Sequence, residues 1–352
     1  MAMVNGKFGK IDSSATLSAE YDSRVFGISS NSFQGAKASV SPIIRTERLK
    51  SEDDFIIRFS PALHFSKKIK WFQVSASAGV SISQYIKNND LSHTEPITTI
   101  SIDFDETLSK SKRISNNSKI RFDATFDLGQ KVGASVLEQD LITYTFFDIG
   151  LNVRYNHSPK FGVGGGTSYN VKYYQQGSTS ERPYQDLSTL PITARAFYIY
   201  SEKLDFYTDY TFSRTRDDQS GSATLSDSQS HTFSFGAQGD YSSKLSGNAN
   251  LGYSLQHFEN QSISKQDNLV SSLGIEWIFN VKTSLGLDLT RAFAPSAQGF
   301  SSFGTSSRIS LNHRFTEKVR GLGYFSIGSS EYTYPSFGGS VRDSSSINLY
   351  GF

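Results

Sequence analysis

Apolar and polar side chains alternate with a period of two along most of this chain of 352 residues. In the segment 118–129, for example, Ile120, Phe122 and Phe126 alternate with Arg121 and Asp123. Successive side chains of a β-strand point to opposite faces, so such a segment has one apolar and one polar face. A helix would distribute the same residues around its surface and could not bury them together. The chain is therefore predicted to be all-β.

The alternation predicts about sixteen strands joined by connections of alternating length. The strands are expected near 13–25, 53–65, 72–85, 97–109, 118–129, 142–156, 161–174, 188–200, 204–214, 229–241, 245–257, 268–279, 283–292, 306–315, 319–328 and 341–352. Tight turns are expected at 66–68, 157–160, 201–203, 242–244, 280–282 and 316–318, and the connections between them are longer and rich in Ser, Asn and Gly. Short periplasmic turns, longer extracellular loops and an even strand number are typical of outer-membrane barrels.

The fold class that follows is a transmembrane up-and-down antiparallel β-barrel, located in the outer membrane of a Gram-negative cell. Mean hydropathy is −0.38 and only 37% of the residues are hydrophobic, so no run approaches the roughly 18 apolar residues of a spanning helix. A closed barrel is the other structure that satisfies backbone groups within lipid. We expect residues 11–352 to form one barrel domain after an N-terminal periplasmic tail, 1–10. A soluble β-propeller also fits tight turns recurring every 40 residues or so, but its inner strands would lack a wholly polar face.

Aromatic residues gather at the predicted tight turns, where the interface between membrane and water would lie. They are Phe65, Trp71, Phe72, Tyr155, Phe161, Tyr198, Tyr200, Phe206, Tyr241, Trp277, Phe279 and Phe315. At the C-terminus, Tyr350 and Phe352 end a segment that looks like the terminal signal of outer-membrane barrels. Membrane lipid and the barrel-assembly machinery are accordingly expected partners.

Composition disfavours several other classes of function. The chain carries 35 basic and 33 acidic residues, a balance unsuited to coating nucleic acid, and no cysteine for a disulfide or a thiolate metal site. The six histidines have no metal-ligand spacing, so neither a metal nor a cofactor is predicted. A hydrolase site would need a Ser, a His and an acid together. His231 lies near Ser228, Ser230 and Asp227, but serine-rich loops often contain such combinations by chance. The chain is predicted not to be an enzyme.

Charged residues of both signs occupy the polar, inward-facing positions of the predicted strands. The candidate lumen-lining residues are Arg58, Arg121, Asp123, Asp127, Asp148, Arg154, Lys172, Arg195, Asp209, Glu276, Asp288, Arg308, Arg314 and Arg320, together with Asp103 and Asp105. They would either orient a polar solute in a hydrated channel or form salt bridges that stiffen the wall. Inward aromatic residues could stack on sugar rings or belong to the interface girdle; they are Trp71, Tyr85, Phe197, Tyr207 and Tyr324.

Three segments depart from a regular pattern of strands and turns. Pro61 and Pro191 fall inside predicted strands, where each removes a ladder hydrogen bond, so either the ladder bulges or the strand boundaries differ. The glycines of 162–166 mostly take inward positions and would give a smooth or closely approached wall. The longest loop, about 27–52, holds a few apolar residues and either folds into the lumen as a constriction or stays at the surface.

Several motifs in the first quarter resemble the putative β-barrel porin 2 family. They are Tyr21-Asp22-Ser23-Arg24-Val25-Phe26, the run from Asp53 to Pro61, Ser83-Gln84-Tyr85 and Asn88-Asn89-Asp90, although the family usually has Asn or Asp where this chain has Ser23. The resemblance implies that Pro61 is a family feature. It also implies passage of exopolysaccharide through the outer membrane beside periplasmic export proteins.

The function expected from these observations is passage of a polar solute, with poly- or oligosaccharide export as the preferred cargo class. The alternative is a closed barrel that acts as a scaffold or adhesin through its extracellular loops.

Overall fold

We analysed a computed structural model of the whole chain. It describes residues 4–23, 25, 50–105, 119–135, 140–175, 184, 186–217, 227–259, 265–295, 301–317, 319–333 and 342–351. Most of the loop expected near 27–52, with its proposed constriction, lies outside these residues, as does Phe352.

Sixteen long strands and one short strand account for nearly all of the described chain. They are β1 (Val4–Gly6), β2 (Gly9–Asp22), β3 (Asp54–Ile69), β4 (Phe72–Tyr85), β5 (His93–Asp105), β6 (Ile120–Ser135), β7 (Asp140–Asn156), β8 (Phe161–Tyr174), β9 (Leu187–Ser201), β10 (Leu204–Asp217), β11 (Ser228–Asp240), β12 (Leu245–Phe258), β13 (Gln266–Asn280), β14 (Thr283–Pro295), β15 (Ser301–Arg314), β16 (Arg320–Thr333) and β17 (Arg342–Gly351). One 3₁₀ turn, η3 (Asn89–Leu91), follows β4. The all-β prediction is confirmed, and β2 to β17 correspond one to one with the sixteen predicted strands.

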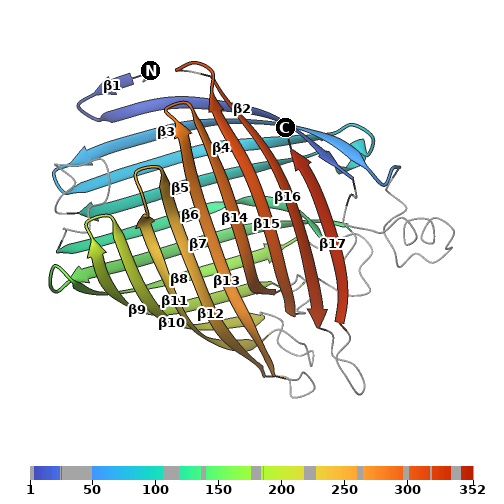
Figure 1. Cartoon of the computed structure of the whole chain (residues 1–352). Helices are drawn as coiled ribbons and strands as arrows, with labels where there is room; N and C mark the ends of the chain where they lie inside the picture. The colour runs from blue at the N-terminus through green and yellow to red at the C-terminus, as the bar shows by residue number, and fades with distance from the viewer. Residues whose placement is uncertain are drawn as a thin grey trace.

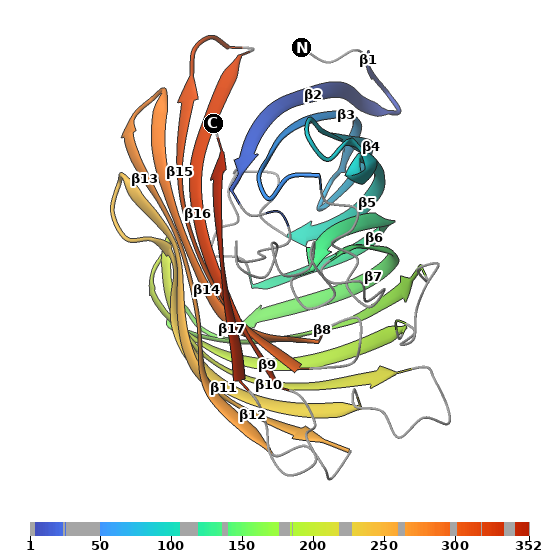
Figure 2. The ribbon, with the colours of Figure 1, turned by 90° about the vertical axis from the view of Figure 1, so that its right-hand side faces the viewer.

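All pairings between successive strands are antiparallel, so the chain forms an up-and-down meander that closes on itself (Figure 1). Closure comes from β17 and β2, which pair through Leu349 with Asp22, Tyr350 with Tyr21, and Gly351 with Glu20. Figure 2 shows β2 to β7 on one side and β13 to β17 on the other, with β8 to β12 between them, surrounding a common interior. The expected fold class, an antiparallel up-and-down barrel, is therefore confirmed.

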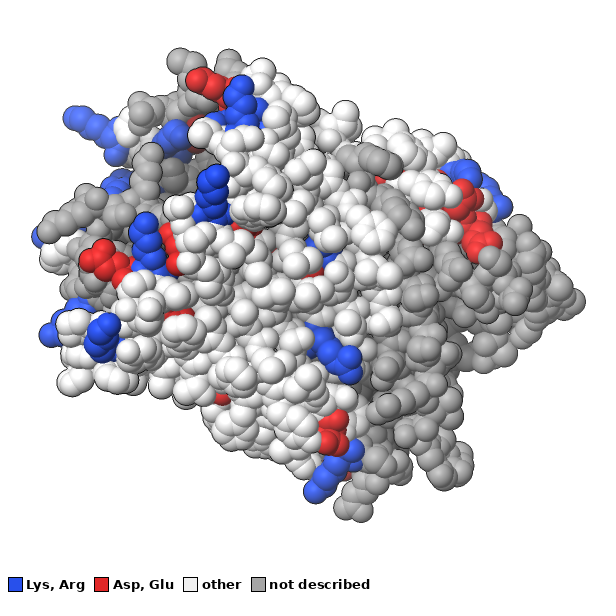
Figure 3. Space-filling view, viewed as in Figure 1, with Lys and Arg blue, Asp and Glu red and all other residues white. Residues whose placement is uncertain are grey.

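The outer face of the barrel is apolar, as the alternation predicts. In the middle of β11, Phe233 is 61% and Phe235 64% exposed, while Leu251 on the neighbouring β12 is 40% exposed. Figure 3 shows that uncharged residues cover most of this surface and that basic residues gather at the end with the tight turns, on the left. Exposed apolar area of this extent needs an apolar solvent, which acyl chains provide. Among the described residues, no helix is long and apolar enough to cross a membrane.

Aromatic rings pack in pairs near the tight turns. Phe161 lies 5.6 Å from Tyr198, and Trp277 lies 4.2 Å from Phe279, measured between ring centroids. Each of these four rings is more than 40% exposed. Their position at the strand ends fits an aromatic girdle where the headgroups begin.

The first tight turn is shorter and later than expected. The sequence predicts a strand over 53–65 followed by a turn at 66–68, but β3 and β4 remain paired to Ile69 and Phe72, leaving a turn at Lys70 and Trp71. Backbone pairing continues past the point where the apolar alternation stops, because lysine side chains at a strand end can reach water. Lys70 takes the left-handed conformation, with φ of 52°, which this tight turn requires.

The N-terminal segment holds strand structure. Residues 4–6 of the expected tail form β1, and β2 begins at Gly9, where β1 folds back onto it.

Both prolines lie within continuous strands beside interruptions of the ladder. The β3–β4 register passes from Phe59–Ile82 to Ala62–Gly79, omitting Pro61. The β8–β9 register likewise passes from Thr167–Ile192 to Asn170–Thr189, omitting Pro191, whose carbonyl instead accepts a hydrogen bond of 2.9 Å from the Thr167 hydroxyl. The ladder is interrupted on one side only, which accommodates a residue without an N–H.

Phe235→Arg tests the apolar outer face. A cationic side chain facing lipid near the bilayer centre should lower the free energy of unfolding by about 2–4 kcal/mol. Phe235→Leu, which stays apolar, should cost much less. Denaturant titrations in phospholipid vesicles measure both, and equal stabilities of the two variants would contradict a lipid-facing position.

Candidate functional site

The inner face of β4 to β11 lines an open cavity of about 660 Å³ with polar and apolar residues. Its lining side chains include Gln73, Asp103, Arg121, Asp123, Asn152, Arg154, Thr193, Arg195, Phe197 and Gln238, and Gly164–Gly166 complete the wall. Five predicted lumen residues therefore meet here: Asp103, Arg121, Asp123, Arg154 and Arg195. They come from four strands, so only the closed sheet brings them together.

Arg154 forms the most deeply buried ion pair of the described chain. Its Nη1 donates to Asp205 Oδ2 at 2.5 Å, and its Nε donates to Asn156 Oδ1 at 2.8 Å. Arg154 is 8% exposed and Asp205 1%. The remaining nitrogen, Nη2, is buried and has no hydrogen-bond partner among the described residues. A buried N–H without a partner is costly, so this nitrogen is a candidate contact for a ligand.

Arg195 repeats this arrangement two strands away. Its Nε and Nη2 donate to the two carboxylate oxygens of Asp209 at 2.5 and 2.6 Å, the bidentate geometry that favours arginine over lysine. Guanidinium groups and rings alternate along this wall: Arg154 lies 3.9 Å from the Phe197 ring centroid, and Arg195 lies 4.3 Å from that of Tyr207. Stacking of this kind holds the cations against the wall.

Glycines make room for these flat side chains. A Cβ on Gly164 would lie 3.0 Å from the Phe197 ring and 2.9 Å from the Val153 carbonyl oxygen. A Cβ on Gly236 would lie 2.6 Å from the Tyr207 hydroxyl. The glycine-rich segment thus acts as a wall that aromatic rings approach closely.

The opposite part of the cavity is acidic. Asp103 and Asp123 are directly paired across β5 and β6, and Asn152 Nδ2 donates to Asp123 Oδ2 at 2.9 Å. Within the described chain, Asp103 receives no hydrogen bond. The cavity thus presents a hydrogen-bond donor at Arg154 and a free acceptor at Asp103.

A second cavity, of about 450 Å³, lies at the tight-turn end of β13 to β16 and contains Glu276, Arg314 and Arg320. The other predicted lumen residues lie outside both cavities. Arg58 donates to Glu20 at 2.5 Å, Asn170 donates to Asp148 at 3.0 Å, and Lys172 lies 5.3 Å from the Tyr144 ring centroid. Arg308 lies opposite Asp288 in the β14–β15 ladder, and Asp127 lies opposite Asp148 in the β6–β7 ladder. The side chain of Asp105 is not among those described.

The predicted inward aromatics Phe197, Tyr207 and Tyr324 already have stacking partners. Phe197 and Tyr207 are only 6% and 8% exposed, with guanidinium groups over both rings, and Arg308 lies 4.0 Å from the Tyr324 ring centroid. Tyr85 is 5% exposed, whereas Trp71 lies in a turn at 43% exposure beneath Lys70. Arginine side chains thus lie over the rings of Phe197, Tyr207 and Tyr324, on which a sugar would otherwise stack.

The arrangement weighed as a hydrolase site does not bring Ser and His together. His231 Nδ1 and the Tyr210 hydroxyl are 2.7 Å apart, and the ring follows the same outward alternation as Phe233 and Phe235. Ser228 and Ser230, at even positions of β11, face the other side. In the portion described, no cluster of three His, Cys, Asp or Glu residues could hold a metal ion.

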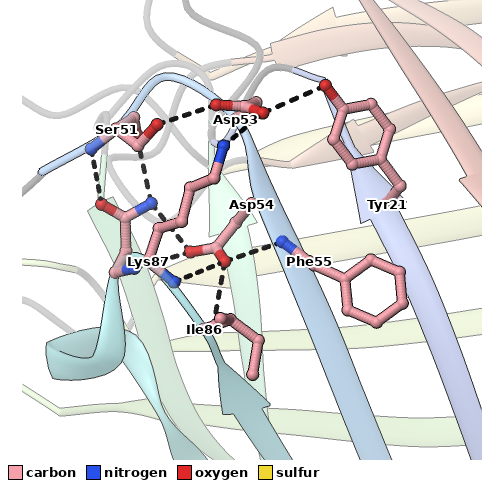
Figure 4. Close-up of polar contacts among 8 residues, drawn as sticks. Tyr21, Ser51, Asp53, Asp54, Phe55, Ile86 and Lys87 are labelled. Carbon is pink, nitrogen blue, oxygen red and sulfur yellow. Dashed lines mark hydrogen bonds and ion pairs between the residues drawn. The ribbon is translucent and has the colours of Figure 1, made fainter.

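At the long-loop end, Asp54 and Asn88 form a buried polar latch that sequence reasoning did not single out as a contact. Both residues are 0% exposed. The Asp54 carboxylate accepts hydrogen bonds from the backbone N–H of Phe55, Ile86, Lys87 and Asn88 and from Asn88 Nδ2, at 2.7–3.0 Å (Figure 4). Asn88 Oδ1 in turn accepts from the backbone N–H of Lys50 and Ser51. The latch joins the chain entering β3 to the chain leaving β4, so two of the segments that carry the family-like motifs are in direct contact.

Beside the latch, Asp53 accepts hydrogen bonds from Lys87 at 2.6 Å, from Ser51 at 2.8 Å and from Tyr21 at 3.1 Å (Figure 4). The hydrogen bond from Lys87, followed by that from Ser51, lowers the pKa of Asp53 from 3.8 to about 2. The same bond raises the pKa of Lys87. Three segments, β2, β3 and the loop after β4, therefore meet at one carboxylate.

Asp54→Asn should loosen the latch, because an amide nitrogen would face the donors of Asn88. We expect backbone amides 86–88 to exchange with deuterium at least about tenfold faster, the effect of losing a hydrogen bond to a charged group. Asp12→Asn, at the other end of the barrel, is the control and should leave this segment unchanged. Hydrogen-exchange mass spectrometry provides the measurement, and unchanged protection in Asp54→Asn would refute the latch.

Acidification should release Asp53. Because its folded pKa lies below the ordinary value, the stabilisation by its charged form is complete above about pH 4 and is lost as the pH falls toward 2. Lys87→Gln should raise the pKa of Asp53, whereas Lys67→Gln, at the far end of β3, should not. Carboxyl ¹³C NMR titration measures the pKa of Asp53 in each variant. If this pKa is the same in Lys87→Gln as in the unmodified protein, the contact between Lys87 and Asp53 is excluded.

A comparison with known protein families agrees with the barrel. Residues 34–343 match the family described as Putative beta-barrel porin 2. No curated protein matches the chain. Among solved structures, the chain is similar to OccAB4 of Acinetobacter baumannii, at 10% identity and a TM-score of 0.39, with 97% of each chain covered. It is also similar to OpdQ of Pseudomonas aeruginosa, at 10% identity and a TM-score of 0.38, again with 97% of each chain covered.

The siderophore receptor PirA from Acinetobacter baumannii is similar at 8% identity and a TM-score of 0.36, with 97% of this chain covered. The chain spans 59% of the length of that receptor. Similarities this distant carry no argument about ligands. The family match over most of the length, together with the closed meander and its apolar outer face, leads to one conclusion: this chain belongs to the Putative beta-barrel porin 2 family of outer-membrane β-barrels.

Proposed function

We propose that this porin-like barrel passes a hydroxylated polar solute across the outer membrane, with poly- or oligosaccharide export as its cargo class. The observation that carries the proposal is the inner wall of β4 to β11, where arginine and aspartate side chains surround a cavity of about 660 Å³. Matched donors and acceptors can exchange hydrogen bonds with sugar hydroxyls as a chain moves along them, without holding any unit tightly.

The selection mechanism we propose is non-covalent. The ion pairs of Arg154 with Asp205 and of Arg195 with Asp209 fix the polar groups of the wall, while Asp103, Arg121 and Asp123 act on the solute. Lipid, the barrel-assembly machinery and periplasmic export proteins are the partners we propose. Tyr350, paired with Tyr21 at the closing seam, would belong with Phe352 to the signal that the assembly machinery reads.

Planar-bilayer recordings test the channel. The purified protein should produce stepwise conductance, and two single substitutions should shift the reversal potential in opposite directions. Arg121→Gln removes a positive charge from the wall and should favour cations, whereas Asp123→Asn removes a negative charge and should favour anions.

The contrary outcome is a sealed bilayer at every voltage, despite a folded protein in the membrane. That result would favour a closed barrel serving as scaffold or adhesin. If neither substitution changes the reversal potential, the ions pass through the barrel away from this wall.

A further inference from the structure

We infer that the cavity on the inner face of β4 to β11 is a binding site for an uncharged saccharide unit, held between the spare Nη2 of Arg154 and the carboxylates of Asp103 and Asp123. The inference rests on the proposed function, because it names the site and the charge class of the same cargo.

The first support is the unsatisfied donor. Arg154 is 8% exposed, uses Nη1 for Asp205 and Nε for Asn156, and leaves Nη2 buried without a partner in a residue that lines the cavity. A buried guanidinium N–H loses its bond to water and regains that energy only if another acceptor arrives. A hydroxyl or ring oxygen of a ligand in the cavity would supply that acceptor.

The second support is the charge balance. Three guanidinium groups, those of Arg121, Arg154 and Arg195, are set against four carboxylates, because Asp205 and Asp209 pair with two of the arginines and Asp103 and Asp123 line the cavity. An anionic ligand would meet the two carboxylates of the lining, while the guanidinium groups of Arg154 and Arg195 are already neutralised by Asp205 and Asp209. Bringing an unmatched charge into such a site is costly. A ligand with many hydroxyls and no charge can instead accept from Arg154 and donate to Asp103.

The third support is the size and form of the cavity. A volume of about 660 Å³ falls within the range of about 300–1,000 Å³ usual for small-molecule sites. Gly164–Gly166 form part of its wall, and the Phe197 ring and the Asn152 side chain lie close against this backbone. Because guanidinium groups cover the Phe197 and Tyr207 rings, recognition would depend on hydrogen bonds and not on stacking on those rings.

Calorimetry of the purified barrel in detergent tests this site, with maltotriose and cellotriose as uncharged probes and trigalacturonate as the acidic probe. We expect at least one uncharged probe to bind, and trigalacturonate to bind more weakly. Arg154→Lys keeps a positive charge beside Asp205 but removes Nη2, so it should weaken binding by about tenfold or more, the effect of one lost charge-assisted hydrogen bond.

Arg308→Lys is the matched control. Arg308 also stacks on a ring, at 4.0 Å from the Tyr324 centroid, but lies on β15, away from the cavity. The affinity of the Arg308→Lys variant for the uncharged probe should equal that of the unmodified protein. Circular dichroism and heat-dependent gel migration verify that both variants fold as barrels.

Three results would overturn the inference: no binding of either uncharged probe, tighter binding of trigalacturonate, or equal affinities in Arg154→Lys and Arg308→Lys. Calorimetry does not require an open channel, so it can refute the saccharide site independently of the proposed channel function. A conducting barrel that binds no uncharged probe refutes only the site, whereas a barrel that binds sugar but never conducts refutes only the channel.

Discussion

The structure depends on the need to pair every backbone N–H and C=O group in surroundings that offer no water. A meander of antiparallel strands satisfies that need only when its first and last long strands also pair. Here the closing pair is β2 and β17, joined near their ends through Asp22, Tyr21 and Glu20. Once the sheet is closed, the alternation of each strand has a fixed meaning, because odd and even residues face lipid or the enclosed interior.

Closure also decides where charge is allowed. The outer face is apolar through mid-strand residues such as Phe235, so the ionisable groups of the strands concentrate on the inner wall. There, Arg154 and Asp205 are nearly excluded from solvent, at 8% and 1% exposure. Such a pair contributes less to stability than its short distance suggests, because desolvation offsets much of the attraction. Its clearer effect is to hold a guanidinium in one orientation with one nitrogen left over.

The two ends of the barrel are built differently. The tight-turn end has short hairpins and exposed aromatic pairs, such as Trp277 with Phe279, suited to the headgroup region. At the long-loop end, one buried carboxylate, Asp54, organises the start of β3 and the segment after β4 through five N–H groups. These hydrogen bonds fix the bases of the loops without restricting the inner wall.

Sequence reasoning reached the strands because a period of two is a local signal. It located sixteen long strands, their faces and the aromatic ends, and it missed the two-residue turn at Lys70 because pairing outlasts the alternation. It could not decide between a ladder interruption and a wrong boundary at Pro61, since that depends on the register of the neighbouring strand. It named Asp54 within a motif but not its contact with Asn88, which joins residues 34 apart in the chain.

The sequence alone therefore determined the fold class, the alternating faces and the set of charged residues available to the interior. Only the tertiary structure decided which of them meet: that Arg154 pairs with Asp205, 51 residues away, that Phe197 lies beneath it, and that Asp103 lies opposite Asp123. The physical reason is that the side of the sheet to which a side chain points depends only on whether its position in its own strand is odd or even. Contact is set instead by the register between strands and by side-chain packing over the glycines of β8, which no single strand encodes.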